Sequence, residues 1–346
     1  MNLQTTRLAQ PGSAPLAAEK TRPGTAAVEA RGLVKTFGSN RAVDGIDLTV
    51  TEGEICGILG PNGAGKTTML NMLATLLPID SGDAKIFGHD VTREAHAVRQ
   101  LIGVTGQYAS VDENLTAREN LWLFGRLQGL SSRKAHSIGD DLLARFDLTE
   151  AARRPISQFS GGMRRRLDLA ASLITRPALI FLDEPTTGLD PRTRGQMWDT
   201  IRSLAADGST ILLTTQYLDE ADELADRIIL IDHGRKVAEG TPDELKAQIG
   251  TSSLQVTLAD SGTTATAAAL AAEVMHHTPI TTPSGTGFRV KLSDANQAAE
   301  VLIALRDHHL DITNAAIEQP SLDDVFMALT GQPGETSTTE TETSTS

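Results

Sequence analysis

The sequence predicts an α/β fold followed by a smaller α+β domain, and three observations support this prediction. The apolar run Ile55–Leu59 leads into a glycine-rich turn and then an apolar helical segment. Residues 178–182 and 211–215 form two further apolar runs, as expected of strands in a parallel sheet covered on both faces. Beyond Thr251 short alternating runs and alanine-rich segments predict a separate domain.

Composition limits the classes of protein that the chain can belong to. Its 346 residues leave room for one large and one small domain. The net charge of -13, from 31 basic and 44 acidic residues, argues against nucleic acid as the main partner, because such binders usually carry a basic excess. Cys56 is the single cysteine, so no intrachain disulfide can form, and a reducing compartment fits. We expect this thiol to be buried and inert.

The two ends of the chain are expected to lie outside the folded domains. Residues 1–28 predict a disordered leader without the apolar segment of a secretory signal, and residues 332–346 predict a disordered acidic tail. No apolar run approaches the roughly 18–20 residues that cross a bilayer. If the protein works at a membrane, another chain must span it.

The main domain is expected over residues 29–250. Alternation over residues 30–53 predicts antiparallel strands, and residues 67–77 predict a helix that ends at Pro78. A helical subdomain is expected at about residues 113–158.

The remaining elements follow from capping and periodicity. A crossover helix over residues 192–204 has Asp190 as its N-cap and Pro191 at its first position. The accessory α+β domain is expected over residues 251–331, with strands near Val256 and Val290.

A glycine-rich loop gives the first functional signal. It matches the pattern G-x-x-x-x-G-K-[ST], in which backbone N–H groups and a helix N-terminus hold phosphate. The lysine reaches the β- and γ-phosphates, and the next hydroxyl ligates Mg²⁺. A chance match is the alternative, which the strand before the loop and the helix after it disfavour. The residues assigned to this nucleotide site are Gly60, Pro61, Asn62, Gly63, Ala64, Gly65, Lys66, Thr67 and Thr68.

Two acids at the end of an apolar strand give the second signal. Asp183 can hold Mg²⁺, and Glu184 can polarise an attacking water. A third signal is Ser160-Gly161-Gly162 before a helical segment, which is either another anion cradle or a plain N-cap and turn.

These motifs, with Gly188-Leu189-Asp190 and in this order, resemble the nucleotide-binding subunit of an ABC transporter. The resemblance covers residues 28–250. The amino-acid sequence of residues 160–170, 214–222 and 320–326 is similar to that of the daunorubicin-resistance branch of drug exporters.

The resemblance implies further roles. Phe37 matches the aromatic residue that stacks on adenine, where most relatives carry Tyr, and Val43 would pack beside the base. Gln107 matches the glutamine that senses Mg²⁺ and the attacking water. Ser160, Gly161 and Gly162 would contact ATP held by the other protomer of a homodimer. Asp190 would lie at the dimer seam.

One position departs from the family pattern. The family usually has His where this chain has Gln216, and an amide can orient water but cannot titrate near neutral pH. This puts the histidine role in doubt but leaves ATP binding intact. Residues 164–166, three arginines in a row, are interpreted as a solvated helix face, with contact to a cytoplasmic loop of a partner as the alternative.

The resemblance implies an α/β P-loop ABC ATPase core that hydrolyses ATP with Mg²⁺. As a dimer on separate membrane-spanning permease subunits, at the cytoplasmic face of the cell membrane, it would drive export of a hydrophobic, drug-like compound. The alternative is an ABC-type ATPase acting on DNA or ribosomes, but such proteins usually carry two cassettes or a coiled-coil or zinc-bearing insertion. A non-hydrolysing regulator is opposed by Glu184.

Overall fold

A computed structural model of the chain describes residues 25–106, 111–249, 252–282, 284–292, 294, 296–318 and 320–330. The expected tail, most of the expected leader and Gln107 lie outside these residues. The first strand begins at Ala26, earlier than the expected end of the leader, because Ala27 and Val28 are both fully buried.

A six-stranded sheet forms the centre of the main domain, in the order β10-β9-β3-β8-β7-β6. All its neighbouring pairs are parallel except β10 with β9. The predicted runs at β3, β7 and β8 are confirmed, and every residue of these strands is buried. The strands are β3 (Ile55–Leu59), β6 (Ile102–Thr105), β7 (Leu179–Asp183), β8 (Thr210–Thr215), β9 (Arg227–Asp232) and β10 (Arg235–Gly240).

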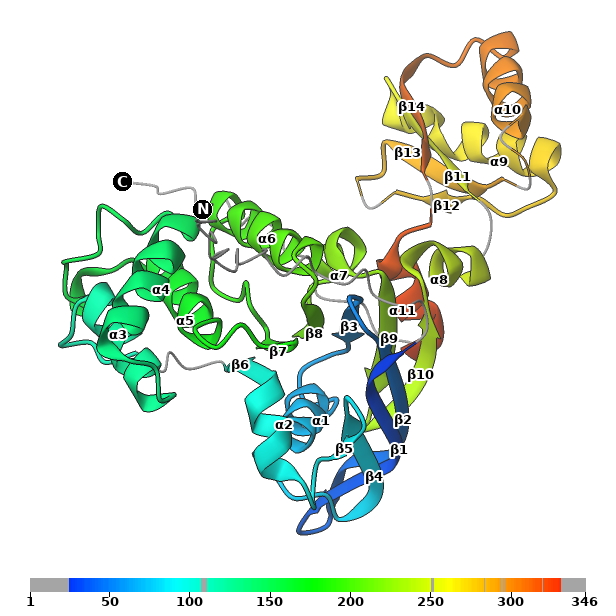
Figure 1. Cartoon of the computed structure of the whole chain (residues 1–346). Helices are drawn as coiled ribbons and strands as arrows, with labels where there is room; N and C mark the ends of the chain where they lie inside the picture. Colours follow the sequence, from blue (N-terminus) through cyan, green and yellow to red (C-terminus); the bar gives the residue numbers. More distant parts are fainter. Residues whose placement is uncertain are drawn as a thin grey trace, which may run out of the picture.

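An antiparallel sheet flanks the central one, in the order β2-β1-β4-β5 (Figure 1). It confirms the antiparallel strands predicted from alternation. One face packs with α1 and the central sheet in a shared hydrophobic cluster. The strands are β1 (Ala26–Phe37), β2 (Asn40–Thr51), β4 (Ser81–Ile86) and β5 (His89–Asp90).

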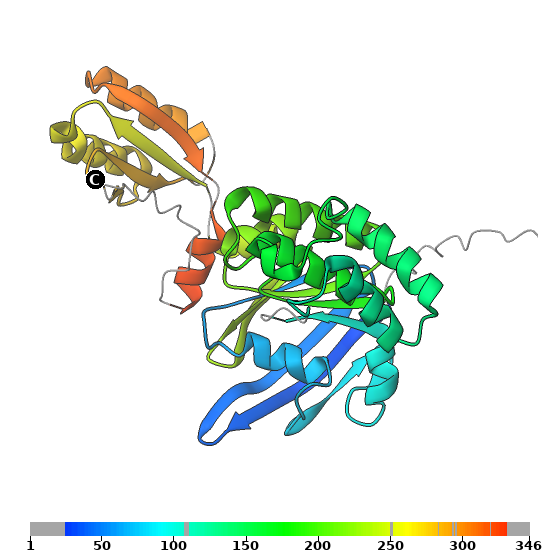
Figure 2. The same ribbon diagram turned by 90° about the vertical axis from the view of Figure 1, so that its left-hand side faces the viewer.

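Helices cover the central sheet, and α3, α4 and α5 gather on one side of the domain (Figures 1 and 2). The α6 start is confirmed, since Asp190 Oδ1 accepts from Thr193 N and Pro191 is the first helical residue. The helices are α1 (Lys66–Leu73), α2 (Ala95–Leu101), α3 (Ala117–Leu127), α4 (Ser132–Arg145), α5 (Gly161–Ser172), α6 (Pro191–Ala206), α7 (Leu218–Leu224) and α8 (Pro242–Ile249), with a 3-10 turn η1 (Ile156–Gln158).

Helix α1 ends at Leu73, earlier than predicted from Pro78. Thr75 adopts a left-handed conformation with φ of 61°. The N–H of Thr75 donates to Met72, and that of Leu76 donates to Asn71. This pair of bonds is a Schellman motif, which closes a helix without proline.

The third sheet belongs to the carboxyl-terminal region and has the order β12-β13-β11-β14. It has its own hydrophobic cluster with α9 and α10, and it stands apart from the main domain in Figure 1. The elements are β11 (Ser253–Leu258), η2 (Ser261–Thr263), α9 (Thr264–Met275), β12 (Ile280–Thr281), β13 (Gly287–Lys291), α10 (Asn296–Asp307), β14 (Ile312–Glu318) and α11 (Leu322–Thr330).

The last helix, α11, packs on the main domain, beside α7, α8 and β9. Leu322, Val325 and Phe326 are buried in one cluster with Leu218 of α7 and Leu230 of β9. Within the described residues, no helix has both the length and the apolar character needed to cross a bilayer.

Candidate active site

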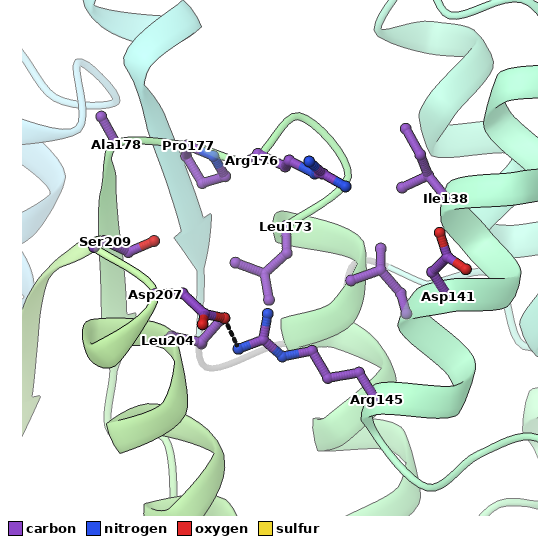
Figure 3. A pocket seen from close by; sticks show the side chains of 12 residues that line it. Ile138, Asp141, Arg145, Leu173, Arg176, Pro177, Ala178, Leu204, Asp207 and Ser209 are labelled. Carbon is purple, nitrogen blue, oxygen red and sulfur yellow. Dashed lines mark ion pairs between the residues drawn. The ribbon is translucent and has the colours of Figure 1, made fainter. Parts of the chain in front are cut away.

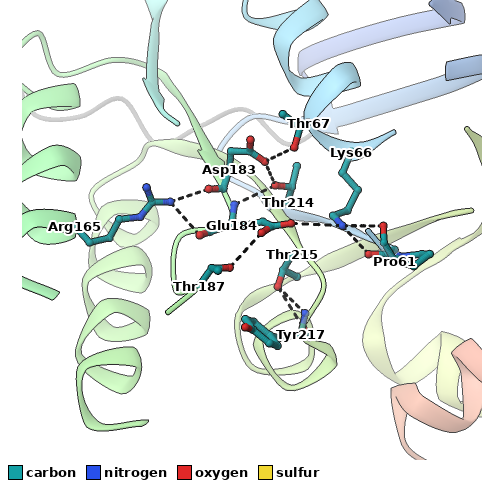
Figure 4. A network of polar contacts seen from close by, with 11 residues as sticks. Pro61, Lys66, Thr67, Arg165, Asp183, Glu184, Thr187, Thr214, Thr215 and Tyr217 are labelled. Carbon is teal, nitrogen blue, oxygen red and sulfur yellow. Dashed lines mark hydrogen bonds and ion pairs between the residues drawn. The ribbon is translucent and has the colours of Figure 1, made fainter. Parts of the chain in front are cut away.

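The predicted phosphate and acid residues meet where three neighbouring strands end. Leu59, the last residue of β3, pairs with Thr215 of β8, and Thr214 pairs with Asp183 of β7. Thr67 Oγ1 at the start of α1 donates to Asp183 Oδ1 at 3.0 Å, and Thr214 Oγ1 donates to the same oxygen at 2.5 Å (Figure 4). Ligands bind at such carboxyl ends in open α/β sheets.

Lys66 is held at the centre of this arrangement and is only 4% exposed. Its Nζ donates to the carbonyls of Gly60 at 2.7 Å and Pro61 at 3.1 Å. The same Nζ lies 3.7 Å from Glu184 Oε1, so the loop and the acid pair form one electrostatic unit (Figure 4).

Two loop glycines have no room for a side chain. A Cβ on Gly60 would lie 2.2 Å from the carbonyl oxygen of Ile231, and one on Gly65 would lie 2.2 Å from that of Ala42. Gly65 also has a φ of +105°, which favours glycine. The tight backbone that results is a concave loop of the kind that binds phosphate.

Glu184 sits in a left-handed backbone conformation with φ of 48°. Such a conformation costs of order 1–3 kcal/mol for a residue other than glycine and persists only where the surrounding structure holds it. Its N–H donates to Thr214, and its Oε2 accepts from Thr187 Oγ1 at 3.2 Å. The carboxylate therefore faces Lys66 from the strand end of β7.

Gln216 follows β8, and its side-chain oxygen is the feature of interest. Its Oε1 is buried without a hydrogen-bond partner among the described residues. Buried side-chain oxygens are normally paired, so this amide fits a site that is completed by a polar ligand. The hydroxyl of Thr67 and the carboxylate of Asp183, which share a hydrogen bond, supply donors that suit Mg²⁺, a hard cation that prefers oxygen ligands.

Arg165 corrects the interpretation of residues 164–166 as a solvated face. Its side chain is 13% exposed, and its guanidinium donates to the backbone carbonyls of Asp183 and Glu184 (Figure 4). Burial lowers the pKa of Arg165, and the nearby Asp168 and Asp183 oppose that shift. The available signal was helical spacing, because Arg165 lies four residues before the buried Leu169.

The residues implied to contact the adenine base lie near the turn that connects β1 to β2. Phe37 is 49% exposed, so its ring is open to a stacking partner, and Lys35 Nζ lies 5.8 Å from its centroid. Val43 is fully buried and pairs with Lys35, so its side chain packs in the core beneath this edge.

The residues implied for the partner's nucleotide lie at helix starts. Ser160 caps α5 by accepting from Met163 N at 3.3 Å, and Gly161 and Gly162 form the first turn. A Cβ on Gly162 would lie 2.5 Å from Thr193 on α6, so the starts of α5 and α6 pack closely. Hydrogen bonds from Thr193 hold the pKa of Asp190 below its usual range.

A cavity of about 580 Å³ lies at the opposite ends of the strands from Asp183. Figure 3 shows Ala178 and Ser209, which precede β7 and β8, on its wall, and an ion pair of 2.6 Å between Arg145 and Asp207 across it. No residue of the phosphate loop lines this cavity.

Comparison with known proteins places this geometry in a family. The family model for ABC transporters matches residues 43–187, and the model for the C-terminal domain of DrrA1-3-like ATP-binding proteins matches residues 240–330. The daunorubicin/doxorubicin resistance ATP-binding protein DrrA of Streptomyces peucetius is 52% identical over 320 residues, which cover 92% of this chain and 97% of that protein. The chain belongs to the ATP-binding subunits of ABC transporters.

Other relatives agree with this membership. The doxorubicin resistance ATP-binding protein DrrA of Mycobacterium tuberculosis is 45% identical, with 90% of this chain and 96% of that protein covered. A dimeric ATP-binding cassette bound to ADP and phosphate in a post-hydrolysis state has a TM-score of 0.57 and 27% identity, with 62% and 98% coverage. The predicted fold class is confirmed: the main domain is an ABC ATPase cassette.

Proposed function

We propose that this ABC subunit hydrolyses ATP at the site around Lys66 and thereby drives an exporter. The observation that carries the proposal is the meeting of Lys66, Thr67, Asp183 and Glu184 within hydrogen-bond or ion-pair distance at adjacent strand ends. A lysine, a hydroxyl and two carboxylates in this order supply the groups that phosphoryl transfer to water needs.

In this proposal Lys66 and the loop N–H groups bind the β- and γ-phosphates, and Phe37 stacks on the base above the buried Val43. Thr67 and Asp183 hold Mg²⁺, with Gln107 as a further ligand. When bound, Mg²⁺ supplies charge neutralisation on the phosphate oxygens.

Glu184 is the residue proposed to accept a proton from the attacking water. Its left-handed backbone aims the carboxylate toward Lys66 and the phosphate loop. Gln216 is proposed to orient the same water, since its unpartnered Oε1 can accept a hydrogen bond and its amide nitrogen can donate to phosphate. Gln107 is proposed to assist from the segment that follows β6.

The complete site is proposed to form between two copies of the chain. The start of α5, with Ser160, Gly161 and Gly162, would face the phosphate loop of the partner, and Asp190 would lie at the seam. The dimeric relative bound to ADP and phosphate supports this arrangement. Separate permease subunits at the cytoplasmic face of the membrane would then be moved by closure and reopening of the dimer.

The exported compound is proposed to be hydrophobic and drug-like. The support comes from the relatives whose names refer to daunorubicin and doxorubicin resistance. The pocket for that compound would lie in the permease subunits.

Sedimentation of the full-length chain with and without ATP tests the shared site. Glu184→Gln should dimerise with ATP, because it binds nucleotide but does not complete hydrolysis. Lys66→Ala should stay monomeric, because the lysine that meets the phosphate charge is gone. A Glu184→Gln protein that binds ATP and remains monomeric would contradict the two-chain site.

A further inference from the structure

We propose that Arg165 is a positioning residue that holds Glu184 in the backbone conformation required for hydrolysis. The inference rests on the role assigned to Glu184 in the proposed function. It adds to that site a residue of α5, the helix that starts at the Ser-Gly-Gly segment.

One guanidinium holds the peptide groups on both sides of the acid. Nη2 donates to the carbonyls of Asp183 at 2.7 Å and Glu184 at 3.0 Å, and Nε donates to that of Pro185 at 3.0 Å. Nη1 donates to the carbonyl of Gly106, the residue that follows β6. Arginine carries five N–H donors in a rigid plane, so a single side chain can fix all four carbonyls.

Burial makes these bonds difficult to replace. Because Arg165 is 13% exposed, water has little access to the carbonyls that it contacts. Removing the donor would leave buried acceptors unsatisfied. The carbonyls lie around Glu184, whose φ of 48° persists only where the surroundings hold it. Loss of the guanidinium should therefore let the backbone relax and move the carboxylate.

The neighbouring arginine provides a matched control. Arg166 is 15% exposed, donates to the carbonyl of Phe146 at 3.1 Å and lies 3.7 Å from Asp147. Its contacts are directed to the end of α4 and not to β7. Arg166→Gln therefore removes a buried guanidinium of the same helix without touching the strand that carries Glu184.

The experiment measures ATP affinity and turnover separately in the full-length chain. Arg165→Gln should lower kcat by about tenfold to a hundredfold, the range for a misplaced catalytic group, with ATP affinity changed by no more than about threefold. Arg165→Lys should fall in between, because one ammonium cannot reach all four carbonyls. Arg166→Gln should keep kcat within about twofold, since ordinary substitutions away from the site act on stability.

A double variant separates positioning from general destabilisation. If Arg165 acts through Glu184, the protein with both Arg165→Gln and Glu184→Gln should turn over no more slowly than Glu184→Gln alone. Melting curves give the folded fraction by which each rate is corrected. If Arg165→Gln does not fold, the turnover of Arg165→Lys is compared with that of wild type in its place.

The outcomes distinguish this inference from the proposed function. If Arg165→Gln turns over like Arg166→Gln while Glu184→Gln is inactive, the positioning role is wrong and the site stands. If Glu184→Gln turns over like wild type, the role of Glu184 is wrong and positioning by Arg165 fails with it. Losses in Arg165→Gln that are confined to ATP affinity would also overturn the inference.

Discussion

Glu220 of α7 is a fully buried carboxyl that lies between the loop after β7 and helix α6. Its Oε1 accepts from Thr186 Oγ1 at 2.8 Å and from Trp198 Nε1 at 3.2 Å. Burial raises the pKa of Glu220 above its usual range, against the opposing effect of these hydrogen bonds. Relative to the unfolded chain, the folded protein therefore favours the protonated form of this acid.

The raised pKa predicts a pH dependence of stability. Between the unfolded pKa, about 4.3, and the raised folded value, the native state binds more protons than the unfolded chain, so the free energy of unfolding falls as pH rises. Glu220→Gln removes this pH-dependent contribution to the free energy of unfolding. Urea unfolding from about pH 5 to pH 8 should show the variant gaining stability relative to wild type with rising pH.

The control for this prediction is Glu223→Gln, which removes an exposed acid from the same helix. A stability difference between Glu220→Gln and wild type that stays constant over the whole pH range would contradict the prediction.

Residues with a fixed spacing in the sequence could be predicted, and residues that act through tertiary contact could not. Lys66, Thr67 and Asp183 follow from a loop pattern and a strand end, and the structure brings them together. Arg165 and Glu220 look like ordinary charged residues of surface helices. Their partners lie on elements that are distant in the sequence, so periodicity within one helix can indicate a buried face but does not identify these contacts.

At the scale of elements, α11 is the one whose position the sequence did not suggest. Its place after the accessory sheet predicted that it belongs to that domain, yet Leu322, Val325 and Phe326 are buried against α7 and β9. An apolar helix face shows that a helix packs, but it does not show against which partner. The strands β12 and β14 could not be predicted from the sequence either. Their residues are exposed or half-buried and show no clear alternation of apolar and polar side chains.

The position of α11 predicts which domain a core substitution affects. Phe326→Ala should destabilise the cassette by about 3–5 kcal/mol, the usual cost of emptying a buried aromatic site. Phe288→Ala, in the separate core of the accessory sheet, is the matched substitution. Both tryptophans, Trp122 and Trp198, lie in the cassette, so their fluorescence reports its unfolding.

Denaturant unfolding followed by this fluorescence should show a lower midpoint for Phe326→Ala and little change for Phe288→Ala. If Phe288→Ala shifts the tryptophan transition as much as Phe326→Ala does, the two cores are not independent.

At the scale of the whole molecule, the cassette and the accessory sheet have separate hydrophobic cores, and α11, which follows the accessory sheet in the chain, packs on the cassette. The phosphate loop and the two acids proposed for hydrolysis lie in the cassette, at the ends of β3 and β7. The strand order that brings these ends together follows from the parallel crossovers. The chemistry is therefore expected to depend on the cassette.

The most direct test of the central claim is steady-state release of phosphate from Mg-ATP by full-length wild type and Glu184→Gln. Bound ATP is measured in the same samples. Glu184→Gln should bind ATP while its phosphate release falls by about a hundredfold or more, the scale for loss of a general base. Release at the wild-type rate by Glu184→Gln, with ATP bound, would contradict the account.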